Sequence, residues 1–258
     1  MLSIITLTYN NFNELKETLA SLPKNDLIES IVVNGGNNNE TYKYLKTHNG
    51  KVINEKDEGI ADAFNKGIKV SSGDAIMFLN SGDILIDLSY PAEAYNVLMK
   101  NKNIHFVHSN ILFSDILGAE LFMKPPFCNL GRGLPYLHPT MIIRKSVFDE
   151  IGTFNTDYKI AMDFDFIVRL VKMGYKGFYR EGKAVVKMEG SGKSAKEELT
   201  AIKECYASLR KNQYITIKNL IGLSQRVILY FLRKLLIKVG AGNLLKGLKK
   251  KKYPMFIC

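Results

Sequence analysis

Four polar clusters of the chain contain residue types that could bind a ligand or carry out chemistry. Each follows or opens an apolar segment, and they are Thr8-Tyr9-Asn10, Asn34-Gly35-Gly36, Asn80-Ser81-Gly82-Asp83, and Asp163 with Asp165. Their amides could bind a nucleotide base and ribose, one carboxylate could bind a hard metal ion, and another could transfer a proton. Because Mg²⁺ typically takes only one or two protein carboxylates besides phosphate oxygens, Asp83 alone would suffice if a diphosphate completed the coordination shell.

Each of these clusters also has a purely structural interpretation. Asn-Ser-Gly-Asp at residues 80–83 is good turn chemistry at the end of an apolar run. Asp163 at the start of a helix would stabilise that helix as a cap or first-turn acid. Asp165 could form an ion pair with Arg169, four residues further along the same helix. The elements around the clusters must decide between scattered turns and a site.

The first eighty-five residues alternate between predicted strands and predicted helices. Such alternation implies parallel pairing through right-handed crossovers, and the apolar runs are typical of strands buried on both faces. Open α/β sheets bind ligands at the carboxyl ends of their strands, where three of the clusters fall. Strands are expected at 3–9, 28–33, 51–54 and 74–80, and helices at 12–22, 40–47 and 59–70.

Beyond residue 85 the pattern changes to shorter strands and longer loops. The most strongly predicted helix is 163–173, with apolar residues on one side and Gly174 as its end. A linker or helix junction is expected at 214–219, followed by an apolar and basic helix over 220–239. Further strands are expected at 104–109, 110–113, 140–144 and 178–188, with helices at 145–151 and from 197 onward.

Composition indicates an ordinary soluble protein of a reducing compartment. The three cysteines are odd in number and far apart, which argues against a disulfide framework or a zinc cluster. The first residues lack the basic region of a signal peptide. No stretch reaches the roughly 18 to 20 uncharged apolar residues that a membrane span requires. We therefore expect a cytoplasmic protein.

The net charge of +11 is concentrated at the C-terminal end. No acidic residue follows Glu204, whereas twelve lysines and arginines do, which leaves 24 basic and 25 acidic side chains in residues 1–204, a net charge of −1. The chain is therefore predicted to be a nearly neutral domain, residues 1–205, with a basic helical tail, residues 206–258.

Three interpretations of the basic tail are open. It could be a solvated charge run, or it could bind nucleic acid, although its apolar residues are not the aromatic platforms that stack on bases. The interpretation we favour is a helix lying on the inner face of the cell membrane. Lys249 to Lys252 would add attraction to anionic lipid of about 1 kcal/mol per charge. The expected apolar face is Ile228, Leu232, Leu235 and Val239, opposite Arg226, Arg233, Lys234 and Lys238.

Five segments together resemble the family 2 glycosyltransferases of the GT-A fold, over nearly the whole of residues 1–200. SIITLTYNN resembles the opening strand of that family, VVNGGNNNE its acidic VVDGGSTD loop, and DEGIADAFNKGI the helix before its metal-binding turn. LNSGD resembles the Asp-x-Asp segment, and KIAMDFDFIVRL resembles the motif that holds the catalytic base. LNSGD together with Leu137-His138-Pro139 resembles bacterial members that build surface polysaccharides.

The resemblance implies a Rossmann-like, mostly parallel sheet flanked by helices, and a glycosyltransferase of hexosyltransferase type. The donor would be a nucleoside diphosphate sugar, UDP-linked, and the acceptor a saccharide carried on polyprenyl diphosphate for O-antigen, capsule or exopolysaccharide synthesis. Asp83 would bind Mn²⁺ or Mg²⁺, which bridges the diphosphate. Asp163 would be the general base of a single displacement that inverts the anomeric carbon.

The resemblance also implies a group of donor-binding residues. Asn34 stands where many relatives have Asp, and its amide oxygen could still accept a hydrogen bond from uracil N3–H. Asn80 and Gly82 replace carboxylates of the fuller pattern, so the metal assignment rests on Asp83. The group consists of Thr8, Tyr9, Asn10, Asn34, Gly35, Asp57, Asn65, Asn80, Ser81 and Gly82.

Four further residues are expected to contact the acceptor or the diphosphate, namely His138, Asp165, Ser191 and Lys193. For His138 an ordinary hydrogen-bonded loop position is the alternative, and for Asp57 in the donor group it is a helix-start acid. The Gly190–Ser194 run lacks the leading glycine and following helix of a phosphate loop, so we interpret it as a loop closing over the donor diphosphate.

Because LNSGD has fewer carboxylates than the family pattern, a second function stays open. A catalytically weak protein that binds nucleotide sugars through the same pocket would have the same donor residues. No nucleic-acid partner is expected, and the sequence does not indicate an oligomeric state.

Overall fold

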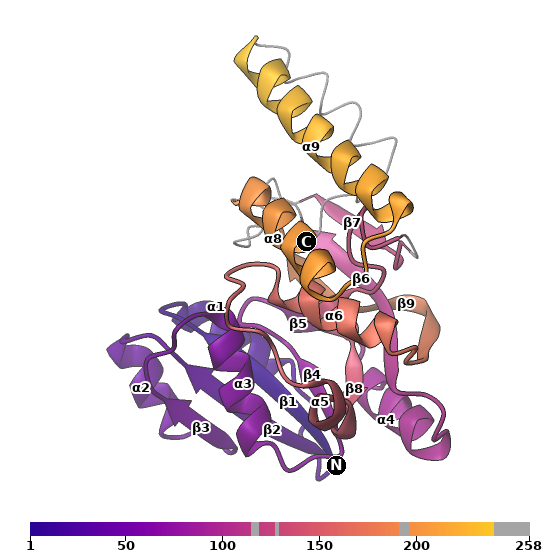
Figure 1. Ribbon diagram of the computed structural model, residues 1–258. Coiled ribbons are helices and arrows are strands. Elements are labelled where there is room, and N and C mark those ends of the chain that lie inside the picture. Colours follow the sequence, from indigo (N-terminus) through magenta and orange to yellow (C-terminus); the bar gives the residue numbers. More distant parts are fainter. Residues whose placement is uncertain (115–118, 127–128, 191–196, 240–258) are drawn as a thin grey trace.

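The computed structural model describes residues 1–114, 119–126, 129–190 and 197–239. Ser191, Lys193 and the Lys249–Lys252 run therefore lie outside the described residues. Within the described ranges the chain forms one curled mixed sheet with helices on both faces, from which a long C-terminal helix projects (Figure 1).

The N-terminal part is the predicted alternation of strands and helices. Its strands β3, β2, β1 and β4 are neighbours in that order, and all three pairings are parallel. The parallel prediction is thus confirmed for this half of the sheet. The elements are β1 (Leu2–Thr8), α1 (Phe12–Ala20), β2 (Ile28–Asn34), α2 (Asn39–Leu45), β3 (Lys51–Asn54), α3 (Ile60–Val70) and β4 (Ala75–Phe78).

The second part extends the sheet mainly with antiparallel strands. The full order is β3-β2-β1-β4-β8-β6-β9-β5, with β7 paired to β6 alone. Only the β6–β9 pairing is parallel here. The elements are β5 (Ile84–Leu85), α4 (Tyr90–Lys100), β6 (Phe106–Ser114), β7 (Glu120–Met123), the 3₁₀ turn His138–Thr140, β8 (Ile142–Arg144), α5 (Lys145–Ile151), α6 (Met162–Lys172), β9 (Gly177–Glu189), α8 (Glu198–Lys211) and α9 (Ile217–Lys238).

Four of these elements differ from the sequence prediction. The two strands expected at 104–113 are one strand, β6, because its polar residues Ser109 and Asn110 are buried and satisfied by hydrogen bonds to backbone carbonyls of β9. Helix α4 and strands β5 and β7 were not predicted. Strand β5 has only two residues, and it is defined by its pairing with β9 rather than by any local pattern.

Alternate side chains of the strands enter two apolar cores, one on each face of the sheet. One core contains Ile5 and Val33 of the strands with residues of α3, α5, α6 and α8. The other contains Ile4 and Val32 with residues of α1, α2 and α4. The sheet is therefore buried on both faces, which explains its apolar strand sequences.

A group of aromatic rings in the first core joins the N-terminal strands to α6. We call it the aromatic cluster, and it consists of Phe64, Phe78, His138, Phe148, Phe154 and Phe166. Phe154 is central, with its ring centroid 5.2 Å from those of Phe64, Phe78 and Phe166. Phe78 is the last residue of β4, and Phe166 lies in the first turns of α6. The cluster consequently sets how these two elements are placed.

The C-terminal helices α8 and α9 contribute side chains to the first core and are therefore only partly a tail. Helix α8 crosses the predicted boundary at residue 205, and Cys205 and Leu209 belong to the first core. Leu223 of α9 belongs to the same core. The start of α9 packs so closely that a Cβ on Gly222 would lie 2.6 Å from the Gly131 backbone. The division of the chain at residue 205 stays a prediction.

Among the helices of the described residues, none combines the length and the apolar composition that a membrane span requires.

The aromatic cluster yields a prediction for stability. Phe154→Ala should lower the free energy of unfolding by about 3 to 5 kcal/mol, because it removes a 3% exposed ring and leaves a cavity among rings that cannot collapse. Urea denaturation measures the loss. The matched control Phe122→Ala removes a half-exposed ring from β7 and should cost at most about 1 kcal/mol. Equal losses in the two variants would contradict the prediction.

Candidate active site

The parallel pairing brings three of the four polar clusters to one edge of the sheet. Thr8 at the end of β1 is directly opposite Asn34 at the end of β2. The backbone N–H of Ser81, just after β4, donates to the Leu7 carbonyl at 3.0 Å. The carboxyl ends of β2, β1 and β4 therefore meet, as the sequence predicted for a ligand site.

Asn10 joins the loops that follow β1 and β2. It adopts a left-handed conformation with φ of 55°, which asparagine tolerates better than most residues. Its side-chain Oδ1 accepts hydrogen bonds from the backbone N–H groups of Asn37 and Asn38 at 2.9 and 3.1 Å. Next to it, Tyr9 is 68% exposed and presents its ring at the edge. Asn10 thus shapes the edge, and Tyr9 is available to a ligand.

Thr8 and Asn34 are support residues in this structure. Thr8 is buried, and its hydroxyl donates to Asn11 Oδ1 at 2.7 Å. Asn34 is fully buried; its Oδ1 accepts from Gly36 N–H at 3.1 Å and its Nδ2 donates to Asn54 Oδ1 at 3.2 Å. The Asn34 amide is therefore not placed to contact a base, contrary to our expectation from the sequence. It holds the turn on which a ligand would lie.

Gly35 and Asp57 face each other across this edge. A Cβ on Gly35 would lie 1.6 Å from Asp57 Oδ2, so the carboxylate lies directly over the glycine backbone. Asp57 Oδ1 accepts from Gly59 N–H at 3.1 Å. The structure thus brings Asp57 to the Gly35 turn, with the small residue needed for that close approach.

The Asn80–Asp83 segment is a tight turn closed by its own side chain. Asp83 N–H donates to the Asn80 carbonyl at 2.9 Å, and Asn80 N–H donates to Asp83 Oδ2 at 3.2 Å. Gly82 has φ of 103°, and its N–H donates to Thr18 Oγ1 at 2.9 Å. The Asn80 side-chain Oδ1 is buried and accepts no hydrogen bond. The turn therefore holds one buried carboxylate and one unsatisfied amide oxygen.

Asp83 has the electrostatic properties of a cation ligand. It is 7% exposed, and burial raises the pKa of its carboxyl to about 7 against the lowering effect of the Asn80 hydrogen bond, with the charge of Glu189 raising it further. Among the described residues no basic side chain pairs with it. A divalent cation would supply the missing positive charge, so the residues present fit such an ion.

The described residues offer no all-protein metal cage. Within them, no group of three or more histidine, cysteine or acidic side chains is gathered in one place. A cation at Asp83 would accordingly take most of its ligands from a bound diphosphate and water, which is the usual arrangement for Mg²⁺.

Glu189 is the site residue that the sequence did not reveal. Strand β5 pairs with β9 through Ile84 and Lys187, and continuing this register brings Asp83 beside Met188 and Glu189. The only available signal was a polar residue at the end of a predicted strand. Because a two-residue strand has no recognisable pattern, the pairing that brings Glu189 near Asp83 could not be predicted.

Asp163 lies in the first turn of α6 and is largely buried. Its Oδ1 accepts from the Phe164 backbone N–H at 2.7 Å. Burial raises the pKa of the carboxyl to about 6, against the lowering effect of that hydrogen bond. No basic side chain of the described residues pairs with it. Asp163 is therefore a carboxylate that can accept a proton near neutral pH.

Asp165 and Asn65 correct the sequence expectation. Asp165 is 2% exposed; its oxygens accept from Arg169 Nε at 3.0 Å, Ser208 Oγ at 2.8 Å and Asn212 Nδ2 at 3.0 Å. The ion-pair interpretation is confirmed, and the carboxylate is turned into the protein.

The Asn65 amide donates to the Phe154 carbonyl at 2.8 Å and accepts from its N–H at 2.9 Å. Asn65 thus holds a loop in place.

His138 is enclosed in the aromatic cluster. Its ring is stacked on Phe78 with centroids 5.6 Å apart, and burial lowers its pKa to about 4. Its Nε2 atom is buried without a hydrogen-bond partner. His138 is accordingly neutral at physiological pH. It is linked to the turn that carries Asp83 through its contact with Phe78, which precedes that turn by two residues.

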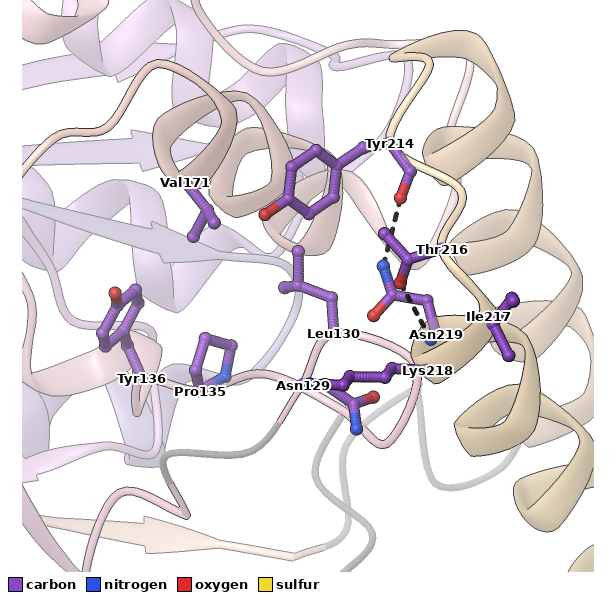
Figure 2. A pocket seen from close by; sticks show the side chains of 10 residues that line it. All are labelled: Asn129, Leu130, Pro135, Tyr136, Val171, Tyr214, Thr216, Ile217, Lys218 and Asn219. Atoms are coloured by element: carbon purple, nitrogen blue, oxygen red, sulfur yellow. Dashed lines mark hydrogen bonds between the residues drawn. The ribbon is translucent and has the colours of Figure 1, made fainter.

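A cleft of about 660 Å³ lies elsewhere, between the 129–136 loop, α6 and the start of α9 (Figure 2). It meets α6 at Val171, two turns beyond Asp163, and contains none of the predicted site residues. Its walls are largely apolar, with Tyr136 and Tyr214 among them. Figure 2 also shows Asn219 closing the start of α9 through hydrogen bonds to Tyr214 and Thr216.

The fold is that of GT-A glycosyltransferases. The chain resembles Staphylococcus aureus TarS 1–349 in complex with UDP-GlcNAc with a TM-score of 0.64 and 18% identity, over 82% of this chain and 65% of that one. It resembles the Pyrobaculum calidifontis mannosyltransferase PcManGT, solved with GDP-Man and Mn²⁺, with a TM-score of 0.61 and 16% identity, over 99% and 81% of the two chains.

The sequence model of Glycosyl transferase family 2 matches residues 3–152, more than half of the chain. The chain belongs to this family and is a glycosyltransferase. The uncharacterized glycosyltransferase YwdF of Bacillus subtilis is 30% identical over 66% of this chain and 68% of that protein. A PGL/p-HBAD biosynthesis glycosyltransferase of Mycobacterium bovis is 25% identical over 66% and 69%. This chain thus matches about two thirds of its relatives' length.

Proposed function

We propose that the protein transfers a sugar from a nucleoside diphosphate donor, a UDP-sugar, to a saccharide acceptor with inversion of the anomeric carbon. The observation that carries the proposal is the pair of carboxylates formed by the buried Asp83 and the partly buried Asp163, which have raised pKa values and no cationic partner among the described residues. Unpaired buried acids are costly to folding and are typical of functional sites.

The edge formed by β2, β1 and β4 would bind the donor. Tyr9 is accessible for the nucleoside, and Asp57 over Gly35 would accept hydrogen bonds from ribose hydroxyls. The likeness to structures containing UDP-GlcNAc and GDP-Man supports a nucleotide sugar at this edge. The turn at Ser81 and Gly82 would face the diphosphate.

Asp83 would hold Mn²⁺ or Mg²⁺ together with the diphosphate. When bound, the ion would offset the negative charge that develops on the departing nucleoside diphosphate. The protein itself contributes the buried position of Asp83, where weak screening makes the charge interaction strong. Asn80 Oδ1, which accepts no hydrogen bond, could take one from a water ligand of the ion.

Asp163 would be the general base. Phe164 N–H holds its Oδ1, which leaves Oδ2 to receive the proton of the acceptor hydroxyl. As that proton moves to Asp163, the hydroxyl oxygen forms a bond to the anomeric carbon, and the bond from this carbon to the diphosphate oxygen breaks on the opposite face. A single displacement of this kind inverts the configuration.

We propose further that α9 attaches the enzyme to an anionic membrane surface, where a lipid-linked acceptor of surface polysaccharide synthesis would be found. The predicted apolar face is exposed: Ile228 and Val239 are each 64% and Leu235 56% exposed. The expected basic face is wrong for two of its four residues, because Arg226 is buried and Arg233 pairs with Glu198. Lys234 and Lys238 remain on the exposed helix.

Replacing the proposed base should abolish transfer without abolishing donor binding. Asp163→Asn should lower kcat about 10²- to 10⁴-fold, since the amide cannot accept the proton, while calorimetry still detects UDP with Mn²⁺. Asp157→Asn, on the exposed loop before α6, is the control. In the unchanged enzyme kcat/KM should fall as pH drops below about 6, because the carboxyl is then protonated. Equal turnover by both variants would refute the assignment of Asp163 as the general base.

The metal requirement should depend on Asp83 and on pH. Asp83→Ala should lower metal-dependent transfer at least about a hundredfold, and the exposed control Asp149→Ala should have no effect. Because the Asp83 carboxyl has a pKa of about 7, a cation must displace a proton below that pH. The Mn²⁺ concentration for half-maximal activity should rise about tenfold per pH unit below 7. Full activity of Asp83→Ala in EDTA would refute the assignment.

Membrane attachment should depend on the apolar face of α9. The triple substitution Ile228→Gln, Leu232→Gln and Leu235→Gln should weaken sedimentation with anionic phospholipid vesicles at least about a hundredfold, because each buried apolar side chain contributes about 1.5 to 3 kcal/mol. A control with Leu121→Gln and Phe122→Gln, exposed on β7, should bind normally. If the unchanged protein stays in solution with such vesicles, the attachment proposal is wrong.

A further inference from the structure

Glu204 of α8 holds the backbone that leads into α6. Its carboxylate accepts hydrogen bonds from three consecutive backbone N–H groups: Lys159 to Oε1 at 3.1 Å, and Ile160 and Ala161 to Oε2 at 2.9 and 2.8 Å. These residues immediately precede Met162, where α6 begins. One side chain therefore fixes the approach to the helix that carries Asp163.

This arrangement lies just outside the N-terminus of α6. The first N–H groups of a helix lack partners within the helix, and a serine, threonine or aspartate at the N-cap usually supplies one. Ala161 occupies the N-cap of α6 and has no side chain that could do so. Glu204, 43 positions after Ala161, instead binds the N–H groups of Ala161 and of the two residues before it, and its negative charge is favourable at a helix N-terminus.

The orientation of Glu204 is itself fixed by the packing of α8. The neighbouring Cys205 is fully buried, and one turn further along Ser208 donates to Asp165 Oδ1 at 2.8 Å. Helix α8 thus holds the start of α6 at two places, through Glu204 before the helix and through Ser208 within its first turns. Between these two places lies Asp163.

We propose that Glu204 is a positioning residue that sets the direction of the Asp163 carboxylate. The inference rests on the proposed role of Asp163 as general base. Without Glu204, three N–H groups lose their acceptor and the 159–161 turn can rotate, which moves the base relative to the acceptor hydroxyl. Since a misplacement of about 1 Å can cost about a hundredfold in rate, the effect belongs to kcat more than to KM for the donor.

The test compares Glu204→Ala and Glu204→Gln with two control variants of α8. Lys203→Ala changes an exposed neighbour, and Ser208→Ala weakens the other attachment to α6 without touching the 159–161 turn. In each folded variant, the pKa of the Asp163 carboxyl is measured by ¹³C NMR, with the resonance assigned from Asp163→Asn. Amide hydrogen exchange at 159–161 and kcat with KM for the donor complete the comparison.

We expect Glu204→Ala to lower the Asp163 pKa from about 6 toward its ordinary range, because the carboxyl becomes more exposed to water. Amide exchange at 159–161 should rise at least about tenfold, and kcat should fall about ten- to a hundredfold with the donor KM nearly unchanged. Glu204→Gln, which retains one acceptor oxygen of the same shape, should recover much of the loss.

Two outcomes would overturn the positioning role. One is a folded Glu204→Ala variant with an unchanged Asp163 pKa and unchanged kcat. The other is an equal loss in Ser208→Ala, which would mean that only the docking of α8 matters. Failure of the proposed function is distinguishable, because Asp163→Asn would then retain full turnover whatever the NMR and exchange measurements of the Glu204 variants show.

Discussion

The relative position of the two unpaired acids depends on the packing of the aromatic cluster. Asp83 follows Phe78 by five residues, and Asp163 precedes Phe166 by three, so each acid is attached to a ring of this cluster. Phe154 lies between the two rings and is fixed in turn by the Asn65 amide. Close-packed rings have few alternative arrangements, and the distance between metal ligand and base would be set by this contact.

Around this core, most polar residues of the site region hold backbone rather than face a ligand. Asn10, Asn34, Asn65 and Glu204 all bind backbone N–H groups of neighbouring loops. Buried polar atoms of a folded protein normally find such partners. Three side chains of the site region differ from this pattern. Asp83 and Asp163 each accept one backbone N–H, but their pKa values are raised and no basic side chain of the described residues pairs with them. Asn80 Oδ1 accepts no hydrogen bond.

The sequence predicted the N-terminal half well because its signals are local. Apolar runs at β1, β2 and β4 and amphipathic helices between them imply parallel pairing, and parallel pairing aligns the polar clusters at one edge. In the second half, β5 is defined by its pairing with β9, more than a hundred residues away, and β7 by its pairing with β6. The amphipathic pattern of α9 likewise indicated the exposed row at Leu232 but not the burial of Arg226.

By itself the sequence determined the fold class, the family, the order of the motifs and the residues Asp83 and Asp163 as the acids of interest. Only the tertiary structure decided which polar side chains are free. It turned Asn34 and Asp165 inward, brought Glu189 beside Asp83, and assigned Glu204 to the turn before Asp163. The physical reason is that the hydrogen-bond partners of these side chains lie far away in the chain, 89 positions for Asn65 and Phe154, and spacing along the chain does not encode them.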